Sequence, residues 1–300
     1  MIDSFLEPIL RCPEHLSQPL RKSEQQFHCT VCGQVYPVSN GMINMMIAGN
    51  DEHQGRFFRQ EEKQWDEHAA HYDERRENSP EYRNGLYAGL AKINPVIQKG
   101  QIVLDVGCGT GLGTCQMHRT ENRTVAMDIS SESLRYLKAK CETLGILSGM
   151  AFVQGGLPGI PFADKSFDHV ICANALQHLP NADTREATVR ELSRVLKPGG
   201  TAVVSVHNYS PAKKKAGWKK EGTSGSFSGQ VQYIYRLELE EFRDLLERHL
   251  TVSAITGAGF ALPYKWKLSP VSFWLERQIL QQWTSWADKG MMSIAVCQKK

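Results

Sequence analysis

An acidic residue followed by closely spaced glycines is the stretch of this chain best suited to hold a small ligand. The segment "IVLDVGCGTGLG" (102–113) carries Asp105 near the end of an apolar run and then glycine at every second position from 107 to 113. Glycine lets the backbone of such a turn approach a ligand closely. A dinucleotide fingerprint would need glycine at position 112, and a phosphate loop would need Gly-Lys-Ser/Thr. Because the sequence has neither, we expect a ligand that presents something other than phosphate.

Two carboxylates indicate which ligand that is. Asp105 would repel phosphate but favours a cation, and S-adenosylmethionine carries one in its methionyl ammonium and has no phosphate. Asp128 ends the next apolar run, "RTVAMDI" (123–129), where a carboxylate can take both hydroxyls of a ribose. Ile129 follows and could lie against an adenine ring. The alternative, an ordinary strand-loop-helix with an unrelated glycine cluster, does not explain why these features fall in register.

A second group of residues has the spacing of metal ligands. Cys12 and His15 in "CPEH" and Cys29 and Cys32 in "CTVC" form the pattern Cys-x2-His-x13-Cys-x2-Cys. Four such ligands are what a tetrahedral, structural zinc takes. So small a unit buries little apolar surface, and zinc would supply much of its folding energy, roughly 10 to 16 kcal/mol in zinc-finger peptides. The alternative is three reduced cysteines beside an exposed histidine.

The elements that must position these residues follow from the apolar periodicity. Short apolar runs predict strands, and the amphipathic stretches 130–145 and 184–200 predict helices between them. This alternation predicts an α/β fold, a Rossmann-like seven-stranded and mostly parallel sheet with helices on both faces. Ligands of such sheets bind beyond the carboxyl ends of the strands, where the acid and glycine turn lies. The predicted strands are 101–106, 123–129, 150–154, 167–173, 201–207, 250–256 and 292–298.

The chain divides by composition into a zinc-ribbon-like head (1–48), a polar connector (49–80) and the α/β domain (81–300). In the connector, Tyr72 and two further aromatic residues recur at steps of seven and share one helical face. The connector is therefore predicted to be a helix that lies on the domain, not a free linker. The two other aromatic residues are Phe58 and Trp65.

Two segments of the domain are expected to shape an acceptor site. Residues 210–230 carry five lysines around Trp218 before a glycine- and serine-rich stretch, which predicts a mobile lid. The other interpretation is a solvated loop whose lysine stems pack on Trp218. Residues 258–290 hold four of the six tryptophans and are predicted to be a helical insertion that packs on the sheet, part of which could roof an apolar pocket.

Composition and charge narrow the location and the partners. The chain is 41% hydrophobic and 22% charged, with a net charge of +3, which neither requires nor excludes a nucleic-acid partner. No apolar run reaches the 18 or so residues of a membrane helix, and the N-terminus lacks a signal-peptide pattern. We therefore expect a cytoplasmic protein whose eight cysteines are metal ligands or small buried side chains.

The domain resembles the class I S-adenosylmethionine-dependent methyltransferase family, and its motifs are close to those of the type 11 group. The resemblance rests on "LDVGCGTG", "VAMDIS", "GIPFADKSFDHVICANALQHL" and "ELSRVLKPGG", spread over about 100 residues in the order of the family. It implies that Asp105 binds the methionyl ammonium and Asp128 the ribose. Gly107 and Gly109 would then line the cofactor, and Asn174 would approach its methionyl part.

The resemblance extends to the connector and includes one departure. Tyr72 in "HAAHYDE" is similar to the N-terminal tyrosine with which family members close over the cofactor. The family often has an acid that holds the adenine amino group where this chain has Gly156. Adenine would then be held by the backbone of Leu157 and by apolar packing. The head, in turn, resembles the small ribbons that accompany some RNA methyltransferases, through "LRCP", "CxxCG" and "YPVSNGMINMM".

Two histidines are candidates for a general base, which methyl transfer needs only if the acceptor holds its proton. His178 follows the fourth strand, where it could instead be a packing residue, and His207 follows the fifth. Three functions fit the sequence. The first is methylation of a small, apolar or aromatic acceptor. The second is methylation of RNA held by the ribbon and the lysines. The third is a non-catalytic docking role.

Overall fold

The computed structural model describes residues 3–46, 52–118, 121–224, 232–260 and 287–300. Its centre is the predicted seven-stranded sheet, in the order β14-β15-β11-β10-β7-β8-β9. β15 runs antiparallel to both of its neighbours, and the strands from β11 to β9 are parallel. The seven strands are β7 (Ile102–Val106), β8 (Arg123–Asp128), β9 (Met150–Gln154), β10 (Phe167–Ala173), β11 (Leu196–His207), β14 (Leu250–Ala258) and β15 (Met292–Lys299).

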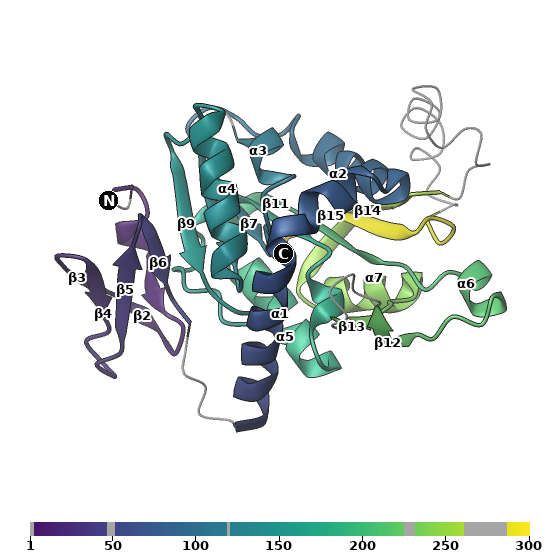
Figure 1. The fold of residues 1–300 in the computed structure, drawn as a ribbon, viewed down its shortest axis with the longest axis horizontal. Coiled ribbons are helices and arrows are strands. Elements are labelled where there is room, and N and C mark those ends of the chain that lie inside the picture. The colour runs from purple at the N-terminus through teal and green to yellow at the C-terminus, as the bar shows by residue number, and fades with distance from the viewer. Residues whose placement is uncertain (1–2, 47–51, 119–120, 225–231, 261–286) are drawn as a thin grey trace.

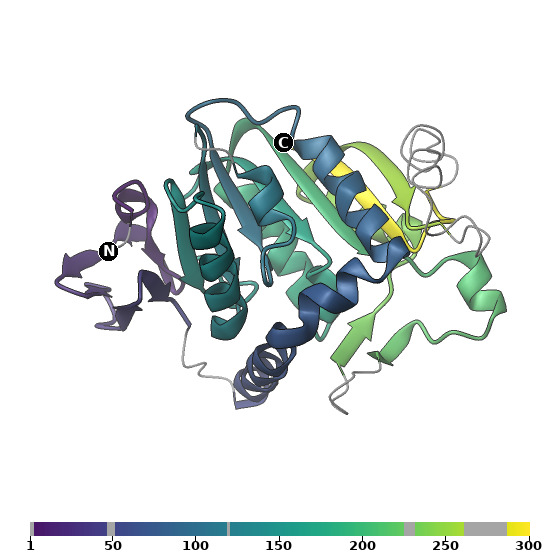
Figure 2. The same cartoon turned by 45° about the horizontal axis from the view of Figure 1, so that its top comes forward.

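Helices cover both faces of this sheet, as predicted (Figure 2). Successive residues of a strand point to opposite faces. In β7, Val103 therefore packs with Ala88 of α2, while Leu104 belongs to the core that holds Leu192 of α5 and Phe242 of α7. The helices are α1 (Glu52–Glu77), α2 (Pro80–Ile93), α3 (Thr114–Met117), α4 (Ser131–Thr143), α5 (Ala182–Val195), α6 (Pro211–Lys215) and α7 (Leu239–Glu247), with short 3-10 turns η1 (Glu7–Ile9) and η2 (Leu176–His178).

The head joins the same sheet, which the sequence did not predict. β6 pairs with β9 in parallel, so that the sheet continues through β6, β5, β4 and β3 to eleven strands (Figure 1). Leu10 bridges to Phe162 of the domain, and both side chains are fully buried. The pairing is non-local, so periodicity within either segment gave no sign of it. The head strands are β1 (Arg11–Cys12), β2 (His15–Pro19), β3 (Arg21–Ser23), β4 (Gln26–His28), β5 (Val35–Ser39) and β6 (Met42–Asn44).

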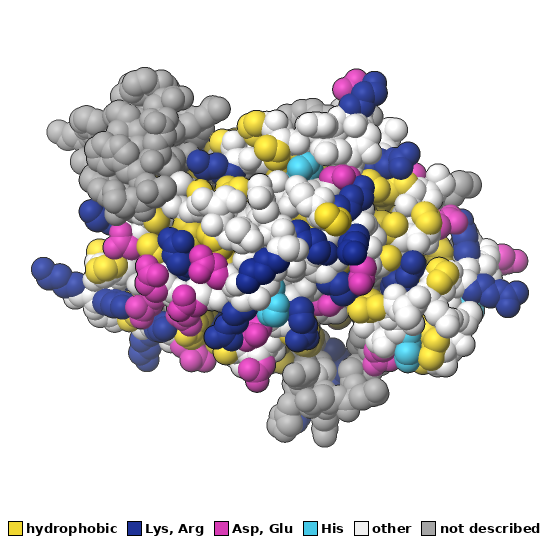
Figure 3. Space-filling view, turned by 180° about the vertical axis from the view of Figure 1, so that it is seen from behind, with side chains coloured by type: hydrophobic (Ala, Val, Ile, Leu, Met, Phe, Trp, Pro, Cys, Tyr) yellow, Lys and Arg dark blue, Asp and Glu magenta, His cyan; other side chains and the backbone are white. Residues whose placement is uncertain are grey.

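Two of the expected segments lie partly outside the described residues. Of the predicted lid (210–230), the structure describes α6 and β12 (Glu221–Ser224), and β12 forms a hairpin with β13 (Gln232–Tyr235), which follows the lid. Residues 225–230 of the lid and residues 261–286 of the predicted insertion (258–290) are not described. Among the described helices, none is long and apolar enough to cross a bilayer. Figure 3 shows acidic and basic side chains interspersed over one face of the molecule.

Candidate active site

Two cavities open beyond the carboxyl ends of the parallel strands. The larger lies between α1 and the ends of β7, β8 and β10, and the smaller lies between α2 and the ends of β7, β10 and β11. The two cavities share the side chain of Tyr72 and the ends of two strands. An elongated ligand could therefore run from one cavity into the other. The shared residues are Tyr72, Gly107, Ala173 and Asn174.

Each cavity contains one of the two predicted carboxylates. Asp105 lines the smaller cavity, is 4% exposed, and accepts one hydrogen bond from the Thr114 hydroxyl at 2.6 Å. Asp128 lines the larger cavity and accepts from the backbone N–H groups of Gly109 at 2.8 Å and Ser130 at 2.9 Å. Burial raises the pKa of each carboxyl to about 6. A cation or a hydroxyl donor bound here would offset that penalty.

The junction between the cavities is shaped for close approach of a ligand. Gly107 has a φ of +70°, and a Cβ there would lie 2.7 Å from the Cβ of Ala175, so only glycine fits. Asn174 also has a positive φ, of 56°, and its side-chain Oδ1 is buried without a hydrogen-bond partner in the described structure. An orphaned acceptor of this kind is costly unless a ligand donor reaches it. A methionyl ammonium is a donor of the right chemistry.

The residues predicted for adenine lie at the far end of the larger cavity. Ile129 and Leu157 line it, together with Gly155, whose missing Cβ leaves room beside Met127. Gly156 does not line the cavity, and a Cβ there would first meet Met46 of the head at 3.8 Å. The contact expected of Gly156 therefore falls to its two neighbours. Gly109 lines the larger cavity and has a positive φ of 54°.

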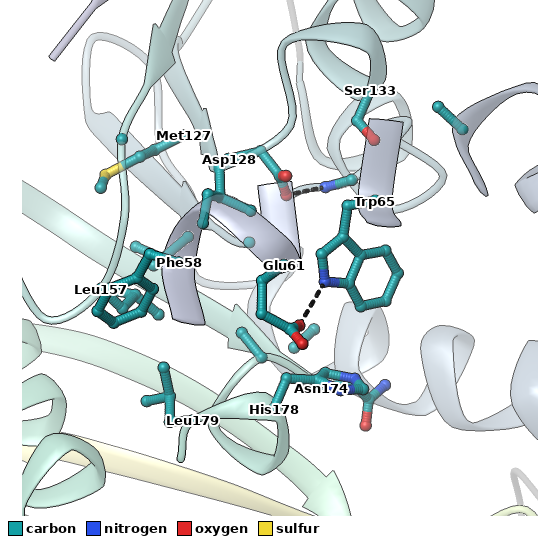
Figure 4. A pocket seen from close by; sticks show the side chains of 18 of the residues that line it. Phe58, Glu61, Trp65, Met127, Asp128, Ser133, Leu157, Asn174, His178 and Leu179 are labelled. Carbon is teal, nitrogen blue, oxygen red and sulfur yellow. Dashed lines mark hydrogen bonds between the residues drawn. The ribbon is translucent and has the colours of Figure 1, made fainter. Parts of the chain in front are cut away.

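Helix α1 forms the roof of the larger cavity and is tied down on both sides. Asp66 accepts hydrogen bonds from the Ser130 hydroxyl at 2.6 Å and from the Glu132 N–H at 3.0 Å, at the start of α4. Asp73 binds Lys140 of α4 and Thr110 of the glycine turn. The cavity face of the helix is apolar except at one position, as Figure 4 shows. Its lining residues are Phe57, Phe58, Glu61, Trp65, Ala69 and Tyr72.

Glu61 is the exception on that face, and the sequence analysis did not single it out. Its side chain is 6% exposed, and within the described residues its carboxylate accepts one hydrogen bond, from the Trp65 indole N–H at 3.2 Å. Burial raises its pKa to about 7. The sequence held a signal for it, because position 61 lies four residues before Trp65 on the face that the aromatic residues define.

The two histidines predicted as bases lie in different places. His178 lines the larger cavity; its Nδ1 lies 2.8 Å from the carbonyl oxygen of Tyr233 and so donates to it, while burial lowers its pKa to about 4. Its ring packs edge-on against Trp65, with 5.1 Å between the ring centroids. His207 lines neither cavity, and its Nε2 is buried without a partner among the described residues. Burial and the nearby Lys213 cation keep its pKa well below the usual value.

The four predicted metal ligands come together in the head. The ligand atoms of Cys12, His15, Cys29 and Cys32 all lie within 4.8 Å of one another. The Cys12 sulfur is 3.5 Å from His15 Nδ1 and 3.9 Å from the Cys32 sulfur. Ligands about 2.3 Å from a tetrahedral zinc would be roughly 3.8 Å apart, so the geometry fits. The Tyr36 hydroxyl donates to the Cys12 sulfur at 3.1 Å, as an outer-shell partner of a metal site would.

The lysine-rich segment is less free than its sequence suggests. Lys214 pairs with Glu238 at 2.6 Å, and Lys220 pairs with Glu241 at 2.8 Å. Lys213 Nζ donates to the carbonyl of Asn208 at 2.7 Å and stands 5.6 Å from the Trp218 ring. Three of the five lysines thus bind the protein itself. This agrees with the interpretation in which the lysine stems pack around Trp218.

Comparisons with known proteins agree with this geometry. Residues 104–204 match the family model of the methyltransferase domain. The chain is 34% identical over 111 residues to the ubiquinone/menaquinone biosynthesis C-methyltransferase of Klebsiella pneumoniae, a match that covers 36% of this chain and 43% of the relative. The chain thus spans about two fifths of the length of the curated relatives it matches.

Solved structures share the fold at low sequence identity. A chain from the complex between the Haloferax volcanii Trm112 methyltransferase activator and a candidate methyltransferase has a TM-score of 0.56 and 21% identity, over 79% of this chain and 96% of that one. The Burkholderia thailandensis 1,6-didemethyltoxoflavin-N1-methyltransferase, solved with its acceptor and S-adenosylhomocysteine, has a TM-score of 0.54 and 14% identity, over 92% of this chain and 100% of that one. These two likenesses concern the fold.

Proposed function

The chain carries a methyltransferase domain of the S-adenosylmethionine-dependent class, and from this premise we propose that it methylates a small apolar or aromatic acceptor. The observation that carries the proposal is the pair of cavities joined at Gly107 and Asn174, with Asp105 buried at one and Asp128 at the other. A ligand with a cation at one end and a ribose in its middle matches this distribution of charge.

The residues present fit S-adenosylmethionine. Asp105 and the orphaned Oδ1 of Asn174 would hold the methionyl ammonium, and Asp128 the ribose hydroxyls. Ile129 and Leu157 would flank the adenine, and Tyr72 would close over the junction. When bound, this cofactor supplies a methyl group on a sulfonium sulfur, open to attack by a nucleophile. The work of the chain is then to align the acceptor and to exclude water.

We infer the acceptor class from the part of the larger cavity that the proposed cofactor-binding residues do not line. That part is lined by Phe57, Phe58, Trp65 and Leu179, which favour a flat or apolar molecule. The quinone named for the Klebsiella relative is of this kind, but the match covers only 36% of this chain. The acceptor is therefore inferred from the roof helix itself.

RNA is the second candidate acceptor, and its support is the head and Trp218, which is 51% exposed beside Lys213 and Arg236. Against it, Lys214 and Lys220 are neutralised by glutamates of the same chain. A non-catalytic role, the third possibility, would leave the buried Asp105 and the unpaired Asn174 unexplained. Salt separates the first two candidates, because RNA binding weakens steeply with salt and binding of an apolar acceptor does not.

We also propose that the head binds one structural zinc ion through Cys12, His15, Cys29 and Cys32. Support comes from the convergence of the four ligand atoms and from the Tyr36 hydroxyl. All four positions are taken by protein ligands, so such a site would have no open position for catalysis. The eight free cysteines fit the reducing, cytoplasmic location that we predict. The division into a head (1–48), a connector (49–80) and a domain (81–300) remains our proposal for the domain organisation.

The experiment that tests the proposed function is transfer of labelled methyl from S-adenosylmethionine into a cell extract split into RNA and small-molecule fractions, with Asp105→Ala as the control. Label in the organic small-molecule fraction, absent with the variant, is the expected result. Label in the RNA fraction would replace the first acceptor class by the second. Label in neither fraction, with wild-type protein that does not bind S-adenosylhomocysteine, would overturn the proposal.

A further inference from the structure

We propose that Glu61 of α1 receives the proton of the acceptor, and that the acceptor therefore presents an ionisable O–H or N–H group on an apolar or aromatic frame. The inference rests on the proposed function and narrows its substrate class. Within the described part of the matched region 104–204, the carboxylate that lines the larger cavity is Asp128, which already accepts from two backbone N–H groups.

Glu61 lies on the face of the roof helix α1 that lines the larger cavity. Its carboxylate projects into the larger cavity from the roof helix, away from Asp128 and toward His178 and Leu179 (Figure 4). His178 and Leu179 follow the end of β10, next to Asn174 at the junction of the two cavities. A molecule bound against His178 and Leu179 would have Glu61 above it and the junction of the two cavities beside it. The carboxylate thus faces the acceptor side of the cavity and not the adenine side.

The Glu61 carboxylate has few hydrogen-bond donors around it in the described structure. The Trp65 indole N–H occupies one of its oxygens, which leaves the second oxygen and further lone pairs without a donor in the described structure. Apart from His178 and Asn174, the side chains that line this part of the cavity are apolar or aromatic, and no lysine or arginine is among the described lining residues. A buried carboxylate without a countercharge is costly unless a ligand donor compensates it.

The ionisable groups that share the cavity do not compete for this role. Asp128 on β8 is engaged by two backbone N–H groups. His178 on η2 donates from Nδ1 to the Tyr233 carbonyl, its Nε2 lies 3.5 Å from the amide nitrogen of Gln177, and burial lowers its pKa to about 4, which makes it a weak base. The Tyr72 hydroxyl, further along α1, lies 2.9 Å from the Tyr82 hydroxyl. The neighbouring Glu62 faces away, toward the amide of Gln154 at 2.8 Å. Burial then brings the pKa of Glu61 close to neutrality, where a base works best.

In this proposal Glu61 takes up the proton that the acceptor loses during methyl transfer. As the acceptor oxygen or nitrogen forms its bond to the methyl carbon, the bond from that carbon to sulfur breaks and its electron pair stays on sulfur. The acceptor proton passes to Glu61, which becomes a neutral carboxylic acid in its apolar surroundings. Glu61 returns this proton to water after the methylated product leaves. Trp65 holds the carboxylate in place through its indole N–H.

The test uses the full chain saturated with S-adenosylhomocysteine and a matched pair of probes, 2-naphthol and its methyl ether 2-methoxynaphthalene. The two share an aromatic frame, but only the naphthol has a proton to donate. Binding of each is measured by equilibrium dialysis at pH 6 and pH 8, for wild type and for Glu61→Gln. Glu61→Gln keeps the shape of the side chain and can still accept from Trp65. Glu74→Gln, an exposed glutamate of the same helix, is the control.

We expect wild type at pH 8 to bind the naphthol about 10-fold or more tightly than Glu61→Gln does, since a hydrogen bond to a charged group is lost. The preference of wild type for the naphthol should weaken at pH 6, and the ether should bind alike to all three proteins. Equal binding of the naphthol to wild type and Glu61→Gln would overturn the inference. So would a loss of S-adenosylhomocysteine affinity in Glu61→Gln, since Glu61 would then belong to the cofactor. In both cases wild type still binds S-adenosylhomocysteine, so the proposed function stands.

Discussion

Asn44 in the head strand β6 lies opposite Gln154 in β9, and the side chain of Gln154 reaches from there to α1 and to the residue that follows β8. Its side-chain N–H group donates to Glu62 of α1 at 2.8 Å and to the carbonyl oxygen of Ile129 at 3.1 Å. A single residue thus connects the last strand of the head, the roof helix and Ile129, which lines the larger cavity. The fold of the head and the shape of the site are therefore coupled through a continuous set of hydrogen bonds.

Removal of zinc from the head is expected to weaken cofactor binding through this connection. If the metal supplies much of the folding energy of the head, its loss frees β6 from β9 and with it the restraint on Gln154. Coupling between two sites typically changes affinity 5-fold or more. Metal analysis should find about one zinc per chain, and calorimetry with S-adenosylhomocysteine should show the loss after chelation and recovery when zinc is returned. Unchanged affinity in a metal-free protein would rule out the coupling.

Asp105→Ala should lower cofactor affinity by about 10- to 100-fold, since a hydrogen bond to a charged group is removed. The affinity of wild type should also depend on pH. Burial raises the Asp105 pKa to about 6, and only the ionised carboxylate attracts the methionyl ammonium. Calorimetric titration with S-adenosylhomocysteine should therefore give tighter binding at pH 7.5 than at pH 5. An affinity that Asp105→Ala leaves unchanged would refute the assignment.

The same burial predicts that Asp105→Asn stabilises the ligand-free protein. The folded pKa of about 6 lies above the ordinary value of 3.8, so the folded state binds more protons between these values. Stability therefore falls as pH rises from about 4 to 6, and above pH 6 the full penalty is present. Replacing the carboxylate by a neutral amide should raise the free energy of unfolding at pH 7.5 by about 1–3 kcal/mol. Thermal melts at pH 4.5 and 7.5 test this, and the gain should be clearly larger at pH 7.5, where the full penalty is present.

The site residues that could be predicted from the sequence are those that belong to a motif with a characteristic local spacing. Asp105 and Gly107 belong to one motif and Asp128 to the next, and the pairing of β7 with β8 brings these strand ends side by side. The convergence of Cys12 and Cys29 could be predicted because metal ligands recur in close pairs. The strands themselves were recognisable because a sheet buried on both faces uses apolar runs.

The parts that were missed depend on contacts between distant segments. The pairing of β6 with β9 joins residues more than 100 positions apart, and nothing in "GMINMM" names its partner. Glu61 reads as one of many charges in a polar connector, and only the docking of α1 shows that it faces inward. The sequence also could not show that Gly155 and Leu157 line the larger cavity while Gly156 between them does not.

Gly107→Ala tests the close approach at the junction of the two cavities. The added methyl would lie 2.7 Å from Ala175, and the positive φ of 70° already disfavours any side chain. We expect the variant to lose cofactor binding and to unfold at a lower temperature than wild type. Gly222→Ala is the matched control, because a Cβ there meets nothing within 4 Å. Comparable losses in the two variants would show that the effect is not specific to the junction.

The pH dependence of methyl transfer separates the two residues that could act as the base in the larger cavity. Glu61, with a pKa of about 7, predicts a rate that rises with pH through neutrality, because only the carboxylate can take a proton. His178, with a pKa of about 4, is neutral throughout this range and predicts a flat profile. The rate of methyl transfer, measured as label entering the extract fraction that accepts it, should therefore rise about 10-fold between pH 6 and pH 8 in wild type. In Glu61→Gln the same rate should be low and independent of pH. A rise that survives in Glu61→Gln would place the titrating group on the acceptor itself.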